Sequence, residues 1–93
     1  MEVSTSAYRV VMEALTNARQ HAPQATAVDV WVRRTRDQLL VRVANDGPVP
    51  RPSAGSPGYG LVGLTERVRA AGGRIGSGPG VDGGWVVDAV FPL

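Results

Sequence analysis

The chain has 93 residues with 10 basic and 8 acidic side chains, and its formal net charge is +2. Every basic side chain is an arginine, cysteine is absent, and His21 is the only histidine. These absences exclude thiolate nucleophiles, disulfides, cysteine zinc sites, Schiff-base chemistry and a Walker-type phosphate loop. The length allows one domain, no apolar run approaches the ~20 residues of a membrane span, and the lack of cysteine fits a cytosolic protein. The net charge is too small to indicate a nucleic-acid partner.

The first half of the chain predicts a helix followed by a hairpin. Apolar residues recur at helical spacing over 6–21, and Pro23 ends the pattern. Two runs then alternate apolar and polar residues, around 28–32 and 39–43, as half-buried strands do. The short link over 34–38 favours an antiparallel hairpin. The apolar positions of the helix are Ala7, Val10, Val11, Ala14, Leu15 and Ala18.

The second half predicts a long loop, a second helix and two more strands. Residues 45–60 hold four of the 7 prolines and four of the 12 glycines, so they form a loop of functional length. A helix over 61–71 ends at Gly72-Gly73, and strands follow near 74–77 and 85–91. The expected fold is an α/β (α+β) two-layer sandwich, with both helices on one face of a mixed, mainly antiparallel sheet.

A polar stripe runs along the first helix. Glu13, Asn17 and His21 are spaced by four residues, so they lie on one shoulder of the apolar face. One oxygen from this stripe, with phosphate oxygens and waters, would suit Mg²⁺. The alternative is an ordinary solvated shoulder.

Two further motifs flank the long loop. Gly58, Gly60 and Gly63 form a G-x-G-x-x-G pattern before a helix, where backbone N–H groups can approach phosphates, or they form only a flexible hinge. No strand precedes them, which excludes a Rossmann fingerprint. Asn45-Asp46-Gly47 ends a strand, where it could read the edge of a base or simply make a turn.

Taken together and in this order, the three motifs resemble the ATP-binding catalytic domain of sensor histidine kinases, in the GHKL (Bergerat-fold) ATPase superfamily. The resemblance runs from Tyr8 to Leu93. The segments that carry it are Glu-Ala-Leu-Thr-Asn-Ala-Arg-Gln-His-Ala at 13–22, Asn-Asp-Gly at 45–47 and Gly-Tyr-Gly-Leu-Val-Gly-Leu-Thr-Glu-Arg-Val at 58–68. The last of these, with the Ala-Gly-Gly after it, looks like the subfamily that signals to LuxR-type response regulators.

The resemblance implies a role for each motif residue. Asn17 would be the Mg²⁺ ligand of the N box, Glu13 the catalytic residue that orients metal-bound water or polarises the transferring phosphoryl group, and His21 part of the ATP-binding N box. Residues 46–60 would form the ATP lid. The other ATP-binding residues would be Asn45 and Gly47 beside adenine, and Gly58, Tyr59, Gly60, Leu61 and Gly63 at the phosphates.

Three positions depart from the family pattern. Asn45 stands in the register of the adenine-reading aspartate, Trp85 stands where a threonine usually follows the late glycine pair, and Gln20 stands where the N box often has lysine. These changes remove charge or hydrogen-bonding groups from the nucleotide site. A domain that keeps the fold as a weakly nucleotide-binding or non-catalytic regulatory module is therefore the alternative.

The expected protein is a cytoplasmic two-component histidine kinase, of which residues 1–93 are an N-terminally truncated Bergerat-type domain. In such kinases Mg-ATP is positioned for phosphoryl transfer to a histidine on a separate dimerisation domain. Expected partners are ATP or ADP, that domain and a LuxR-type response regulator, with a homodimer only in the full-length kinase and no nucleic acid. His21 lies in the N box, so it is not the phosphoacceptor. An anti-sigma-factor serine kinase of the same superfamily is a further alternative, against which the 58–68 run argues.

Overall fold

The computed structural model describes residues 2–21, 24–47, 59–81 and 83–93. It opens with helix α1 (Glu2–His21), which begins one turn before the predicted start at Ser6. Val3 extends the apolar face by a turn and packs against the core, while Ser6 is buried inside the helix. The helix therefore extends beyond the predicted range at its N-terminal end.

The four predicted strands form one sheet. They are β1 (Val28–Arg34), β2 (Gln38–Asn45), β3 (Arg74–Pro79) and β4 (Trp85–Pro92), in the spatial order β1-β2-β4-β3. All three neighbouring pairs are antiparallel, so the described sheet is purely antiparallel rather than mixed. The predicted hairpin is confirmed: Val32 faces Val41, and the Thr35 N–H donates to the Gln38 carbonyl at 2.8 Å in the turn.

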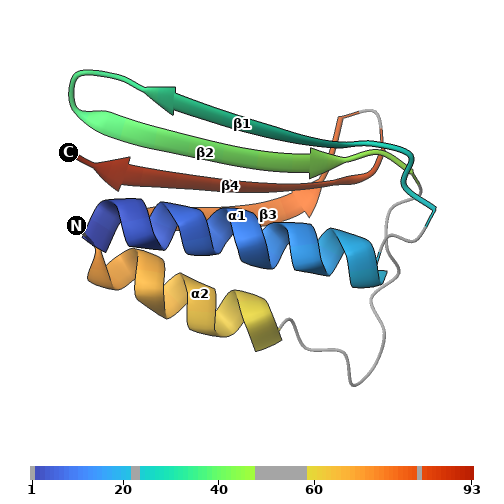
Figure 1. Cartoon of the computed structure of the whole chain (residues 1–93), viewed down its shortest axis with the longest axis horizontal. Coiled ribbons are helices and arrows are strands. Elements are labelled where there is room, and N and C mark those ends of the chain that lie inside the picture. Colours follow the sequence, from blue (N-terminus) through green and yellow to red (C-terminus); the bar gives the residue numbers. More distant parts are fainter. Residues whose placement is uncertain (1, 22–23, 48–58, 82) are drawn as a thin grey trace.

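Helix α2 (Tyr59–Ala70) runs antiparallel to α1 on the same face of the sheet (Figure 1). It begins two residues earlier than predicted, so the last two residues of the predicted 45–60 loop belong to the helix. Leu64 and Val68 are buried, and Ala71, just beyond the helix, packs against the core. The predicted two-layer α+β sandwich is confirmed.

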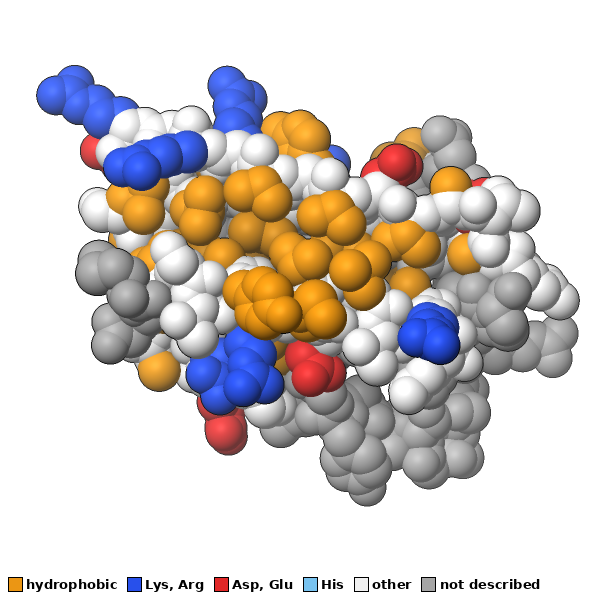
Figure 2. Space-filling view, viewed as in Figure 1, with side chains coloured by type: hydrophobic (Ala, Val, Ile, Leu, Met, Phe, Trp, Pro, Cys, Tyr) orange, Lys and Arg blue, Asp and Glu red, His pale blue; other side chains and the backbone are white. Residues whose placement is uncertain are grey.

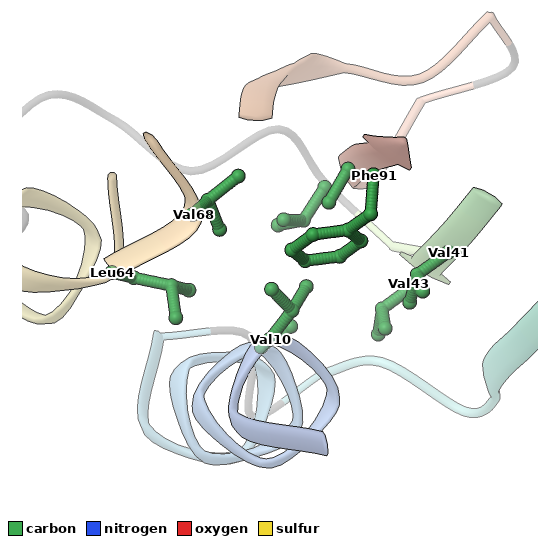
Figure 3. Packing of buried hydrophobic residues seen from close by; sticks show 9 residues of the cluster. Val10, Val41, Val43, Leu64, Val68 and Phe91 are labelled. Atoms are coloured by element: carbon green, nitrogen blue, oxygen red, sulfur yellow. The ribbon is translucent and has the colours of Figure 1, made fainter. Parts of the chain in front are cut away.

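The core lies between the helices and the sheet. Phe91 and Val10 are fully buried, and Figure 3 shows the Phe91 ring pointing between Val10 of α1, Val68 of α2 and the valines of β2. Side chains of a strand alternate between its faces, so Val41 and Val43 of β2 point towards the helices, as Val87, Ala89 and Phe91 of β4 do. This packing fixes which face of the sheet each residue at the strand ends occupies.

Edge strand β1 stays exposed along its whole length. Val28, Val30 and Val32 pair with the helix-facing residues of β2, yet they are 39%, 46% and 56% exposed. Figure 2 shows hydrophobic side chains gathered across the middle of the side of the molecule that is also seen in Figure 1. On the opposite face of the sheet, the guanidinium of Arg42 pairs with the carboxylate of Asp88 at 2.7 Å. None of the described helices is long and apolar enough to cross a membrane.

Candidate functional site

The ends of the helices and strands that carry the predicted site residues lie towards one end of the molecule. Figure 1 shows α1 ending at His21, β2 ending at Asn45 and β4 beginning at Trp85 on this side, and α2 starts from it at Tyr59. The three sequence motifs are far apart in the chain, and the antiparallel arrangement of the helices and of β2 with β4 brings them to a common end.

The polar stripe of α1 has the predicted position. Glu13 and Asn17 are half-buried and flank the buried Ala14 and Ala18. At about 100° per residue they occupy one shoulder of this face, and Leu15 occupies the other. Within the described part of the chain, neither polar side chain has a hydrogen-bond or ion-pair partner. His21 ends the helix, and its side chain lies outside the described residues.

At the end of β2, the strand register separates two adjacent polar residues. Asn45 continues the helix-facing series of Val41 and Val43, and its side chain is half-buried. The Asn45 Nδ2 donates to the main-chain carbonyl of Asp46 at 2.9 Å. The Asp46 carboxylate points instead towards residues 26 and 27, so of these two residues Asn45 is the one on the helix-facing side.

The Asp46 carboxylate faces the segment that leads into β1. One oxygen accepts from the backbone N–H groups of Thr26 and Ala27, at 2.7 and 3.0 Å, and the other accepts from the Thr26 hydroxyl. The Asp46 N–H donates to the Ala27 carbonyl at 3.3 Å. The Thr26 hydroxyl, followed by the backbone N–H of Ala27, lowers the pKa of Asp46 from its usual value. These bonds between Asp46 and residues 26–27 are called the Asp46 clamp below.

A late glycine pair closes the same end of the sheet. Gly83 and Gly84 both have positive φ, and the Gly84 N–H donates to the Gly47 carbonyl at 2.8 Å. A Cβ on Gly84 would lie 1.9 Å from the Asn45 carbonyl oxygen, so only glycine allows this close approach. Gly47 itself has φ +98, which supports the predicted turn. The next residue, Trp85, faces Asn45 in the ladder and packs against the core.

The glycine motif before α2 is only partly described. Gly58 and the lid residues 48–57 lie outside the described residues. Tyr59, Gly60 and Leu61 form the first turn of α2, and their side chains are not described. A Cβ on Gly63 would meet no described atom within 4 Å, so packing does not demand glycine there.

The sequence patterns did not predict the contacts of three residues at this end. Thr26 and the Asp46 carboxylate carry the clamp, and Gly84 controls the distance between β2 and β4. The Gly83-Gly84 pair was a visible signal, because adjacent glycines before a strand often mark a special backbone. No comparable pattern marked Thr26, whose partner lies 20 residues away.

Comparison with known proteins identifies the family. Over residues 2–93 the sequence matches the histidine kinase-, DNA gyrase B- and HSP90-like ATPases. The chain belongs to this family. The predicted resemblance to the ATP-binding domain of sensor histidine kinases is thereby confirmed at the level of the ATPase family.

Three relatives of the chain are named as signalling proteins. The sensor histidine kinase YxjM of Bacillus subtilis (strain 168) is 32% identical over 91 residues, covering 98% of this chain and 22% of the relative. The methanol utilization control sensor protein MoxY of Paracoccus denitrificans is 38% identical over 72 residues, 72% of this chain and 16% of the relative. The signal transduction histidine-protein kinase/phosphatase UhpB of Salmonella typhimurium is 35% identical over 68 residues, 73% of this chain and 13% of the relative. The chain thus corresponds to less than a quarter of the length of each of these three relatives.

Proposed function

We propose that this domain binds Mg-ATP and positions its γ-phosphoryl group for transfer to a histidine on the dimerisation domain of a sensor histidine kinase. The observation that carries the proposal is that α1 and β2 end, and α2 begins, towards one end of the fold, in a chain of the histidine-kinase-like ATPase family. These elements carry Asn17, Asn45 and most of the glycine motif. The relatives named as sensor kinases support the same activity for the full-length protein.

Different residues would bind the base and the phosphates of the nucleotide. The Asn45 amide oxygen accepts from the exocyclic amino group of adenine, and Gly47 lets the backbone pass close to the base. Backbone N–H groups at the start of α2, around Gly60 and Leu61, face the phosphates, aided by the positive end of the helix dipole. Gly58, Tyr59 and Gly63 complete this phosphate-binding segment, and residues 46–60 act as the lid. His21 lines the nucleotide site at the end of α1.

The described donors fit a magnesium ion that is shared with the nucleotide. No cluster of three or more His, Cys, Asp or Glu side chains occurs among the residues that the structure describes. Asn17 offers a half-buried amide oxygen, and Mg²⁺ commonly takes one or two protein oxygens with phosphate oxygens and waters. The bound ion would offset phosphate charge that no lysine offsets here, because Gln20 holds the N-box position. Glu13 lies one turn from Asn17 and would orient metal-bound water or polarise the transferring phosphoryl group.

The finer partners follow from the same proposal. The run over 58–68 supports a kinase that signals to a LuxR-type response regulator, and a homodimer is expected of the full-length kinase. Because ATP is supplied in the cytoplasm, the domain works there. Phosphoryl transfer would then depend mainly on positioning and charge neutralisation.

Calorimetric titration of ATP with and without Mg²⁺ tests the proposal. In the unchanged protein Mg²⁺ should strengthen binding, and Asn17→Ala should reduce the affinity to the Mg²⁺-free value. Asn17→Asp keeps an oxygen ligand and should retain the Mg²⁺ dependence, and Thr16→Ala, on the exposed side of α1, should leave binding unchanged. Undiminished Mg²⁺ dependence in Asn17→Ala would contradict the role of Asn17.

The competing function is a regulatory module that keeps the fold without binding nucleotide. Trp85 favours it, because an indole faces Asn45 where the family pattern has a small hydroxyl. Full-length protein that binds neither ATP nor ADP, with or without Mg²⁺, would establish this alternative in place of the kinase.

A further inference from the structure

The Asp46 clamp joins two segments that no regular strand pairing connects. Residues 24–27 precede β1, and Asp46 follows β2, yet three donors from Thr26 and Ala27 bind the Asp46 carboxylate. The Asp46 N–H returns a bond to the Ala27 carbonyl. Both carboxylate oxygens are therefore occupied, and the peptide that follows Asn45 is held from two sides. Hydrogen bonds to an ionised acceptor are stronger than neutral ones, which makes this attachment firm for an exposed turn.

Holding Asp46 in place also affects its own main-chain carbonyl, which orients the Asn45 carboxamide. Its Nδ2 donates to the Asp46 carbonyl oxygen at 2.9 Å. A flipped carboxamide would place its own oxygen against that carbonyl, two acceptors facing each other, and would lose the bond. With one N–H of Nδ2 donated to the main chain, Oδ1 and the second N–H of Nδ2 remain for a ligand, each at a fixed place. The site therefore presents an acceptor and a donor in one order and not in the reverse order.

We infer that Asp46 and Thr26 are positioning residues for nucleotide selection. They hold the Asp46 carbonyl where it orients Asn45, so that Oδ1 selects a base with an exocyclic amino group over a base with a carbonyl at the same place. The inference rests on the proposed function, in which Asn45 faces adenine. Adenine carries the amino group, and hypoxanthine carries a carbonyl there with an N–H beside it. An Asn45 released from its orientation can flip and accommodate hypoxanthine.

The test compares the affinities for ATP and inosine triphosphate by calorimetry in the full-length protein. Thr26→Val removes the hydroxyl donor with little change of shape, and Asp46→Asn removes the charge. Both variants should lower the preference for ATP over inosine triphosphate by about tenfold, the size expected when one oriented hydrogen bond is lost. Thr26→Ser should restore the preference. Asp37→Asn, at the opposite end of the hairpin, makes the same charge change and should leave the preference unchanged.

A purely structural role of the clamp gives a different result. Thermal melting by circular dichroism would then show lower stability, while the folded variants kept the wild-type preference, and this outcome overturns the inference. Because Thr26 is exposed, Thr26→Val keeps the test informative even where Asp46→Asn fails to fold. Unchanged protein that binds neither nucleotide refutes the proposed function itself and the inference with it.

Discussion

Replacing Gly84 by alanine should lower the free energy of unfolding. Among the described glycines, an added Cβ would come closest to another atom at Gly84. Gly84 has φ +72, where an L-residue costs about 1–2 kcal/mol. The added Cβ would lie 1.9 Å from the Asn45 carbonyl oxygen and 3.1 Å from the Asp46 Cα, so β2 and β4 must separate at this end. Separation endangers the bond from the Gly84 N–H to the Gly47 carbonyl, worth about 0.5–1.5 kcal/mol. We expect a loss of roughly 2–4 kcal/mol in the free energy of unfolding.

Urea denaturation measures this loss, and Gly76→Ala is the matched control. Gly76 lies in edge strand β3, and a Cβ there would meet nothing within 4 Å. Gly76→Ala should leave the free energy of unfolding unchanged or raise it by up to about 1 kcal/mol, because alanine restricts the unfolded chain. A loss below about 0.5 kcal/mol for Gly84→Ala, or equal effects of the two substitutions, would refute the argument from the close approach. ATP affinity should also fall in Gly84→Ala alone, since its clash is with Asn45.

Two other predictions concern the core and the turn. Phe91→Ala should lower the free energy of unfolding by about 3–5 kcal/mol, because Phe91 is fully buried. The ATP affinity of the folded variant should persist, because Phe91 faces Leu39 at the end of β2 away from Asn45. Loss of affinity without loss of stability would contradict this. The pKa of Asp46 is lower in the folded protein than its usual 3.8, so its carboxylate stabilises the fold above that value and ceases to do so as the pH falls through the folded pKa. Urea denaturation should therefore show wild type more stable than Asp46→Asn at pH 7, with the difference closing below pH 3.8, whereas a difference independent of pH would exclude the carboxylate as its cause.

The periodic elements could be predicted from the sequence, and their ends could not. The apolar spacing around Val10 and Ala14 defines α1, but the prediction began the helix near Ser6, among residues that favour helix caps. In the structure Val3 contacts the core, and this burial extends the helix through the serines. Tertiary packing thus outweighs a local capping preference at this end.

The alternation of apolar and polar residues in β1 predicts which side chains share one face of the sheet. It does not predict whether other elements cover that face. Val28, Val30 and Val32 share the face of the buried β2 valines, yet they remain exposed because β1 is at the edge of the sheet, beyond the two helices that cover its middle. Strand order depends on pairings between distant segments. In this chain β4 lies between β2 and β3 and pairs with both. A local sequence pattern in β1 cannot predict this order.

The site was predictable to the extent that strand parity determines it. With Val41 and Val43 assigned to the core, a period of two already places Asn45 on the helix side and Asp46 on the other, so the sequence alone could decide which residue faces the proposed nucleotide. What parity leaves open is how the carboxamide of Asn45 is oriented, and that depends on a partner outside the strand. Thr26 lies in a segment without periodicity, and its bond to Asp46 exists only once β1 and β2 have paired. Under the proposed selection, asparagine in the register where the family pattern has aspartate would lose less selectivity than the missing charge indicates, because the adjacent Asp46 would orient the neutral amide beside it.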